Sequence, residues 1–273
     1  MACYSDFAGQ VRGKGFPARE LEERWEKGVG WTPTNIMINC FGVIPATPWG
    51  ASGDLLLRPD PAGDATLDFG DGTVAERFIL GYVDELDGAP WACCPRHYLA
   101  EALADLEREF GLRLRVAFEH EFTCLGFAPR LGAAYGLESI RQIGDLPEVI
   151  LAALDRAGLE PDTFLPEYAP GQYEVTVRPA LGLEAADRAV KLRQIVRAAT
   201  ARKGWPTMAC SSLSAARRIS GPSGMALASL AGRAAERGRG RCPVNGAGSR
   251  AGSESLHTWP PYAPRHLRRG NRS

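Results

Sequence analysis

Apolar residues recur every three or four positions in several segments, and this period predicts amphipathic helices. The clearest of these segments ends at Gly111, a residue type that often terminates helices because it adopts a left-handed conformation. Another begins with Asp145 and Glu148, which form a capping box, and is followed by Gly158. Together with a charged segment near the N-terminus, the pattern predicts helices over residues 18–27, 95–110, 146–157 and 184–203.

Other segments alternate apolar and polar residues, which is the period of a strand with one buried face. The longest alternation covers residues 112–122 and places Phe118, His120 and Phe122 on one face. Residues 172–177 alternate in the same way. Shorter apolar runs, separated by prolines and glycines that predict turns, indicate strands at residues 35–40, 54–57 and 78–83. Short strands followed by strands and helices in mixed order indicate an α+β fold.

The pattern ends at about residue 206, where the composition changes. From Ala209 onward, only seven of 65 residues are Leu, Ile, Val or Phe, which is too few to build a core. The same residues contain 11 Arg, 2 Glu and no Lys or Asp, a net charge of +9, so residues 1–208 hold the other 21 basic and 30 acidic side chains and carry −9. We therefore expect residues 207–273 to form a disordered basic tail.

The overall composition is that of a globular protein. Hydrophobic residues make up 45% and charged residues 23%, and no apolar run reaches the length of about 18 residues that indicates a membrane span. The N-terminus lacks the basic start and apolar stretch of a signal peptide. The seven cysteines show no zinc-ligand spacing. We expect a cytoplasmic protein with reduced cysteines and no membrane partner.

Four glutamates are candidates for a metal site. Glu119 and Glu121 stand two positions apart, so a continuous strand would project both carboxylates from one face. Glu174 lies on the polar face of the strand over 172–177, and Glu167 precedes it in an extended, proline-rich stretch. Carboxylates held this close repel each other unless a cation lies between them, and oxygen ligands suit magnesium or manganese.

By spacing alone, a solvated sheet face is a more common explanation of the Glu-x-Glu pair than a metal site. His120 falls on the apolar side of the alternation, so we interpret it as a packed core histidine and not as a ligand.

Several motifs resemble those of glutamine synthetases, in the same order along the chain. The Gly-Gln-x-Glu element is quite specific to that family, whereas Glu-x-Glu alone is weak. The resemblance covers about residues 2–206. Within the family, it is closer to the members that join glutamate to amines than to the standard ammonia enzyme. The matching segments are Asp6-Phe7-Ala8-Gly9-Gln10, Arg12-Gly13-Lys14, Ser52-Gly53-Asp54-Leu55, Trp91-Ala92-Cys93-Cys94-Pro95-Arg96, Phe118-Glu119-His120-Glu121-Phe122, and Glu167 with Gly171-Gln172-Tyr173-Glu174.

The resemblance implies a fold and an assembly. Residues 1–90 would form a β-grasp domain, and residues 91–206 would form part of a glutamine synthetase-type catalytic α/β barrel. Members of the family form stacked rings with active sites between neighbouring subunits, so the resemblance also implies a homo-oligomer when the chain is intact.

The resemblance further implies an ATP-dependent ligase. ATP would phosphorylate the γ-carboxylate of glutamate, and ammonia or an amine would then displace the phosphate. Mg²⁺ or Mn²⁺ would serve as cofactor. By position, Glu121, Glu167 and Glu174 would hold the ion near the substrate, and Glu119 would hold the ion that bridges the ATP phosphates.

The resemblance ends after Trp205. The family next carries a Gly-x-His-x-His-x-Ser element, yet residues 215–232 contain no histidine, so we expect this chain to have little or no ligase activity. We interpret the change as a frameshift. Read one base later, suitable codons for residues 224–230 spell Gly-Trp-His-Leu-His-Leu-Ser, which is the missing element.

Two alternatives to an active ligase follow from the tail. The chain could be a non-catalytic, truncated family member that acts as an assembly partner. It could instead bind nucleic acid through the basic segment Arg237-Gly238-Arg239-Gly240-Arg241. That segment lacks the interleaved aromatic residues that stack on bases, so we do not expect a nucleic-acid partner.

Overall fold

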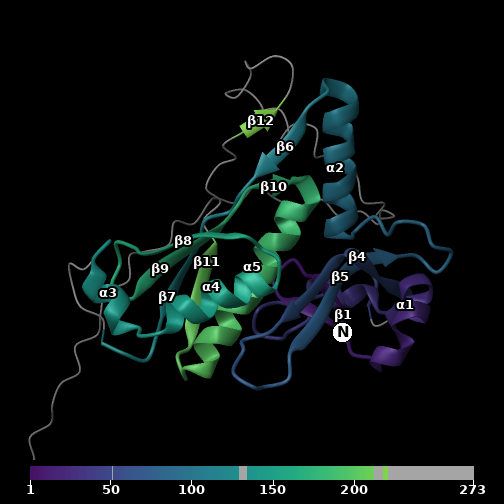
Figure 1. Ribbon diagram of the computed structural model, residues 1–273. Coiled ribbons are helices and arrows are strands. Elements are labelled where there is room, and N and C mark those ends of the chain that lie inside the picture. The colour runs from purple at the N-terminus through teal and green to yellow at the C-terminus, as the bar shows by residue number, and fades with distance from the viewer. Residues whose placement is uncertain (51, 129–133, 212–217, 221–273) are drawn as a thin grey trace, which may run out of the picture. The chain divides into compact units, whose positions relative to one another are not determined.

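The computed structural model describes residues 1–273 apart from 51, 129–133, 212–217 and 221–273 (Figure 1). The arginine-rich segment at 237–241 lies outside this range. The helices are η1 (Ala18–Glu20), α1 (Leu21–Lys27), η2 (Pro33–Met37), α2 (Pro95–Phe110), α3 (Leu137–Gln142), α4 (Leu146–Arg156) and α5 (Gly182–Arg202). The strands are β1 (Ala2–Ser5), β2 (Val11–Lys14), β3 (Val29–Trp31), β4 (Leu55–Leu67), β5 (Glu76–Asp84), β6 (Arg113–Val116), β7 (His120–Cys124), β8 (Pro161–Pro166), β9 (Gln172–Val177), β10 (Ala180–Leu181), β11 (Thr207–Ser211) and β12 (Arg218–Ser220).

The N-terminal strands form one five-stranded sheet in the order β2-β1-β5-β4-β3. Strands β1 and β5 pair in parallel, and the other neighbours pair antiparallel. One face of the sheet packs on a core that includes Tyr4, Trp31, Leu57 and Trp91. The expected strand at 78–83 is confirmed within β5.

Two expectations for this region were wrong. Residues 35–40 do not form a strand, because Pro33 begins the 3₁₀ helix η2 and its fixed φ favours a helical first turn. The turn expected around Pro59 and Pro61 is instead part of β4, which continues to Leu67. The pairing of β4 with β5 shifts register between Pro59 and Asp64, and such a bulge tolerates residues that cannot donate a ladder hydrogen bond.

The later strands form two further sheets, in the orders β10-β6-β12 and β11-β7-β9-β8. The single strand expected over 112–122 is therefore wrong, because β6 ends at Val116 and β7 begins at His120 in a different sheet. Residues 207–211 were expected to be disordered tail, but they form β11, an edge strand paired antiparallel with β7. Apart from β12, the rest of the expected tail lies outside the described residues.

Helices α4 and α5 join the first and last sheets through one continuous core (Figure 1). Ile150 and Leu154 of α4 and Leu192 and Ile195 of α5 are fully buried against β4, β7 and β9 residues such as Leu67. The expected helices at 146–157 and 184–203 are thus confirmed, together with their buried faces. The capping box is not formed, since Asp145 makes no cap hydrogen bond and pairs with Lys203 Nζ at 2.5 Å.

Helix α2 begins at Pro95 and ends at Gly111, whose φ of +63° is the expected left-handed terminator. The periodicity of this helix predicted a buried apolar face. In the structure, no residue of α2 is buried and Phe110 is exposed. Within the part of the chain that is described, no helix combines the length and apolar character needed to cross a bilayer.

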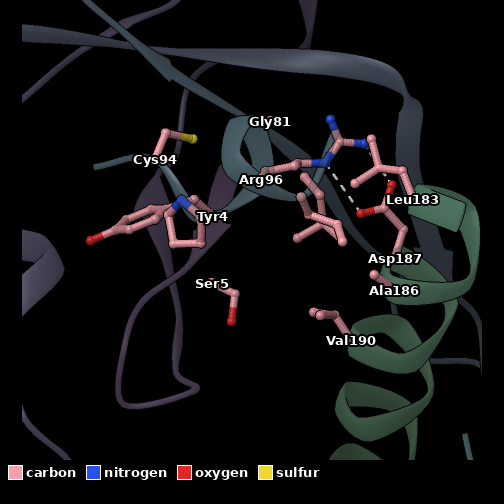
Figure 2. Close-up of a pocket in the computed structure, with 12 residues that line it drawn as sticks. Tyr4, Ser5, Gly81, Cys94, Arg96, Leu183, Ala186, Asp187 and Val190 are labelled. Atoms are coloured by element: carbon pink, nitrogen blue, oxygen red, sulfur yellow. Dashed lines mark hydrogen bonds and ion pairs between the residues drawn. The ribbon is translucent and has the colours of Figure 1, made fainter. Parts of the chain in front are cut away.

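Arg96 ties α2 to both the N-terminal sheet and α5. Its guanidinium forms two hydrogen bonds with Asp187 on α5, at 2.6 and 3.2 Å, and one with Asp60 on β4, at 2.6 Å. Its side chain is 10% exposed and that of Asp187 is 8% exposed. The Arg96 Cζ atom also lies 4.3 Å from the ring centroid of Tyr82. Figure 2 shows Arg96 reaching Asp187 beside a small, mostly apolar cavity of about 140 Å³ between β1, α2 and α5.

Candidate metal-binding site

The acidic residues gather on the face of β7 and β9 that points away from α4 and α5. Phe122 and Tyr173 alternate into the core, so Glu121 and Glu174 project from the opposite face. The two glutamates are directly paired across the antiparallel strands. Side chains at such positions have Cβ atoms about 5 Å apart. The shared face that the alternation predicted for each strand is therefore present, and the register brings the two carboxylates together.

Gln172 connects this face to the loop between β8 and β9. Its amide nitrogen donates a 2.5 Å hydrogen bond to Glu121 Oε2, and its Oε1 accepts one from the Ala169 backbone at 3.1 Å. The backbone of Glu167 donates to the Gln172 carbonyl at 2.8 Å. One amide side chain thus orients Glu121 and fixes the turn that carries Glu167.

Glu119 lies between β6 and β7, not in the same strand as Glu121, which corrects the sequence expectation of a continuous strand. It lines a pocket of about 450 Å³ together with Glu174. The other walls include Arg115, Asp162 and Thr176. The volume is within the range of small-molecule sites, which is roughly 300–1,000 Å³.

Glu167 follows β8 directly and is bordered by two tyrosines. Tyr135 Oη donates to Glu167 Oε1 at 3.5 Å, and the Tyr168 backbone N–H donates to Glu167 Oε2 at 3.2 Å. The two rings meet edge to face, with centroids 5.4 Å apart. Hydrogen bonding to Tyr168 and the nearby Glu167 carboxylate raise the pKa of Tyr135 to about 12, so its phenol is neutral at physiological pH.

The electrostatics of the cluster centre on Glu174. Burial, together with the negative charges of Glu119, Glu167 and Glu121, raises the pKa of Glu174 to about 7. A carboxylate whose charge is disfavoured in this way is stabilised by a bound cation, because the cation removes the repulsion and replaces the proton.

The donor set fits a hard divalent cation in type, because all four side chains offer carboxylate oxygens. The side chains do not stand in chelating positions: among the described residues, no group of three or more His, Cys, Asp or Glu side chains is close enough to hold an ion. The arrangement therefore supplies converging ligands but not a closed cage.

His120 is 7% exposed and its Nδ1 contacts the Phe118 carbonyl at 3.3 Å. Burial lowers its pKa, which keeps the ring neutral. The expectation of a packed histidine on the face opposite to Glu121 is confirmed.

Sequence reasoning missed three features of the site. The hydrogen bond from Gln172 to Glu121 depends on β7 lying beside β9, which the sequence does not show. The alternation over residues 172–177 predicted only that Gln172 and Glu174 share a face. Tyr135 and Tyr168 gave no signal, because they stand in loops and approach each other only through the fold. Arg115 and Asp162 line the same pocket, and this also follows only from the fold.

Comparison with known proteins identifies the family. A model of the glutamine synthetase N-terminal domain matches residues 2–91, and a model of the glutamine synthetase catalytic domain matches residues 92–211. The chain belongs to the glutamine synthetase family.

The relatives include enzymes named for amine substrates. The chain is 32% identical over 214 residues to a γ-glutamylpolyamine synthetase of Streptomyces coelicolor, covering 74% of this chain and 45% of that protein. It is 25% identical over 197 residues to a glutamate–isopropylamine ligase of a Pseudomonas species, covering 66% and 42%. A crystal structure described as a novel glutamine synthase homolog superimposes with a TM-score of 0.70 at 39% identity, covering 75% of this chain and 49% of that one. The chain thus spans about half the length of these relatives.

Proposed function

We propose that the chain carries the first part of the active site of an ATP-dependent ligase that joins ammonia or an amine to the γ-carboxylate of glutamate. One observation carries this proposal: Glu121 and Glu174 pair directly across β7 and β9, and burial together with the charges of Glu119, Glu167 and Glu121 raises the pKa of Glu174 to about 7. Such a site binds a cation that a phosphoryl-transfer reaction needs.

Glu121, Glu167 and Glu174 would hold one Mg²⁺ or Mn²⁺ beside the glutamate substrate, and Glu119 would hold another beside the ATP phosphates. When bound, such ions neutralise the charge on the phosphoryl group that is transferred. Gln172 orients the Glu121 carboxylate through its 2.5 Å hydrogen bond. The pocket lined by Glu119 and Glu174 provides space for the reacting groups.

The reaction has two steps. The γ-carboxylate of glutamate takes the terminal phosphoryl group of ATP, which releases ADP. The nitrogen of ammonia or an amine then attacks the acyl carbon, phosphate leaves, and the nitrogen loses its extra proton. Names of the relatives support an amine as the acceptor, since two of them act on polyamines and isopropylamine.

The domain division and setting belong to the same proposal. Residues 1–90 form a β-grasp domain with the observed five-stranded sheet, and residues from 91 onward form part of a catalytic α/β barrel. Complete members assemble as homo-oligomers in the cytoplasm. The matches of the two family models support this division.

A metal titration tests the proposal. We expect calorimetry to show that Mn²⁺ binds the 273-residue chain. We expect Glu121→Gln to weaken that binding at least tenfold, because a neutral amide, including that of the neighbouring Gln172, cannot replace a charged oxygen ligand. Glu101→Gln on the exposed face of α2 is the matched control and should leave binding unchanged. Equal binding by wild type and Glu121→Gln would reject the site.

We also propose that this chain has little ligase activity by itself, because residues 207–273 contain no Gly-x-His-x-His-x-Ser element. Phosphate release with glutamate, ATP, Mg²⁺ and an amine should not exceed that of Glu121→Ala. Amine-dependent release that disappears in Glu121→Ala would show the opposite, that the chain is catalytically competent.

A further inference from the structure

We propose that the cavity between β1, α2 and α5 is a binding site for a small, uncharged, apolar molecule about the size of a benzene ring. Figure 2 shows the cavity, which has a volume of about 140 Å³. None of the four glutamates of the candidate metal site lines it. The two sites are therefore separate, and ligand binding in the cavity does not depend on the proposed ligase function.

The cavity lies between the two hydrophobic cores of the chain. Leu80 and Val190 belong to or pack against the core that α4 and α5 share with the sheets, whereas Tyr4 and Cys94 belong to the core of the N-terminal sheet. The Tyr4 ring is held edge to face against Trp31, with centroids 5.2 Å apart, so this wall is preformed. A bound apolar molecule contacts both cores and fills the space that their side chains leave open.

The size and the lining of the cavity match a small apolar ligand. Apolar side chains supply much of the wall: Leu80 of β5, Leu99 of α2, and Leu183, Ala186 and Val190 of α5. In another protein, an apolar cavity of about 150 Å³ stays dry and binds benzene or xenon. Leu80 is buried, whereas Leu99 and Val190 are half-buried. The wall is thus closed on the inside and leaves a ligand a route of entry from the outside.

The charge balance of the lining favours an uncharged occupant. Among the described residues that line the cavity, Arg96 and Asp187 are the charged ones, and Figure 2 shows them joined to each other. Nε and Nη2 of Arg96 hold the two Asp187 oxygens at 3.2 and 2.6 Å, and its Nη1 holds Asp60 at 2.6 Å. Because this network is satisfied without a ligand, it does not compensate a further charge. An ion would lose its hydration without replacement, whereas an apolar molecule gains by leaving water.

Titrations with benzene and benzoate test the site, because the two probes share a ring and differ in charge. Each is added to the 273-residue chain at constant pH and ionic strength and followed by the amide signals in NMR spectra. We expect benzene to bind saturably with a Kd of about 1 mM, a reasonable magnitude for a ligand of this size. The signals of residues 4–5, 80–81 and 183–190 should shift first. We expect benzoate to bind at least roughly tenfold more weakly, because of its desolvation cost.

Substitutions at Ala186 locate the bound molecule. Ala186→Leu extends an apolar side chain into the cavity and should weaken benzene binding roughly tenfold or more, and the smaller Ala186→Val should have an intermediate effect. Ala201→Leu makes the same change at an exposed position of α5 and should bind benzene like wild type. Circular dichroism and urea-induced unfolding show whether each variant is folded. Ala186→Val keeps the test valid if the larger leucine prevents folding.

The outcomes are distinct. Saturable benzene binding that is weakened in the folded Ala186 variants and unchanged in Ala201→Leu supports the site. Three results would overturn it: no saturable binding of benzene to the wild-type chain, binding that the Ala186 substitutions do not affect, or benzoate binding as tight as that of benzene.

Discussion

Replacing Arg96 with methionine is expected to lower the free energy of unfolding by about 2–4 kcal/mol, because it leaves Asp187 and Asp60 without their counterion in a largely buried position. Methionine keeps most of the aliphatic length of the side chain, so the loss reports on the charge and its hydrogen bonds more than on packing. Urea-induced unfolding followed by circular dichroism measures the change.

Arg188→Met is the matched control for this prediction. Arg188 is also largely buried, at 13% exposure, but its partners Glu160 and Glu184 are 54% and 58% exposed. Water can solvate those two carboxylates when the arginine is removed, so the expected loss is below about 1 kcal/mol. Equal decreases in the free energy of unfolding of the two variants would show that the buried carboxylates left without a counterion do not explain the effect of replacing Arg96.

Glu174→Gln is expected to remove a pH dependence of stability. An ordinary glutamate has a pKa of 4.5, and burial with neighbouring charges raises that of Glu174 to about 7 in the folded chain. Between these values the folded state binds the proton more tightly than the unfolded state, so stability falls as the pH rises through this window and levels off above it. After allowance for partial exposure, we expect wild type to lose on the order of 1–2 kcal/mol relative to Glu174→Gln across the window.

Unfolding curves recorded at intervals from about pH 4.5 to pH 8 measure this difference. The exposed Glu101→Gln on α2 should follow the wild-type pH dependence. Saturating Mn²⁺ should reverse the loss in wild type at high pH, because the ion compensates the same charges that disfavour deprotonation. A Glu174→Gln variant with the wild-type pH profile would mean that the carboxylates do not interact.

Local periodicity was enough to predict a helix or strand wherever its apolar and polar positions follow one uninterrupted period. Alternation of Tyr173 and Val175 with Gln172 and Glu174 predicted β9 and its two faces, and the spacing along α5 predicted its buried stripe. The break after Val116 was not predictable from alternation. It arises because β6 pairs with β10 and β12 whereas β7 pairs with β9 and β11, and such pairing depends on residues far along the chain.

The candidate site was predictable to the same extent. Period two placed Glu121 and Glu174 on the polar faces of their strands, and the register of β7 with β9 explains why these two residues meet. Glu119 was expected in the same strand as Glu121 but lies outside it, and Glu167 was noted only for its place before Glu174 and its match to the family motif. The contact of Gln172 with Glu121 spans 51 positions, and the approach of Tyr135 to Glu167 spans 32. Contacts across such separations are set by the loops and by strand order, which a single sequence does not encode in any local pattern.

Paramagnetic broadening by Mn²⁺ tests the central claim most directly, because it locates the bound ion in the folded chain without requiring activity. In NMR spectra of the 273-residue protein, we expect substoichiometric Mn²⁺ to broaden the amide signals of residues 119–123 and 165–176 first, and to leave those of β3 and α1 sharp. The same addition to Glu121→Gln should produce little broadening. Broadening that is spread evenly over the chain, or confined to residues outside β7, β9 and their loops, would contradict a metal site built on the four glutamates.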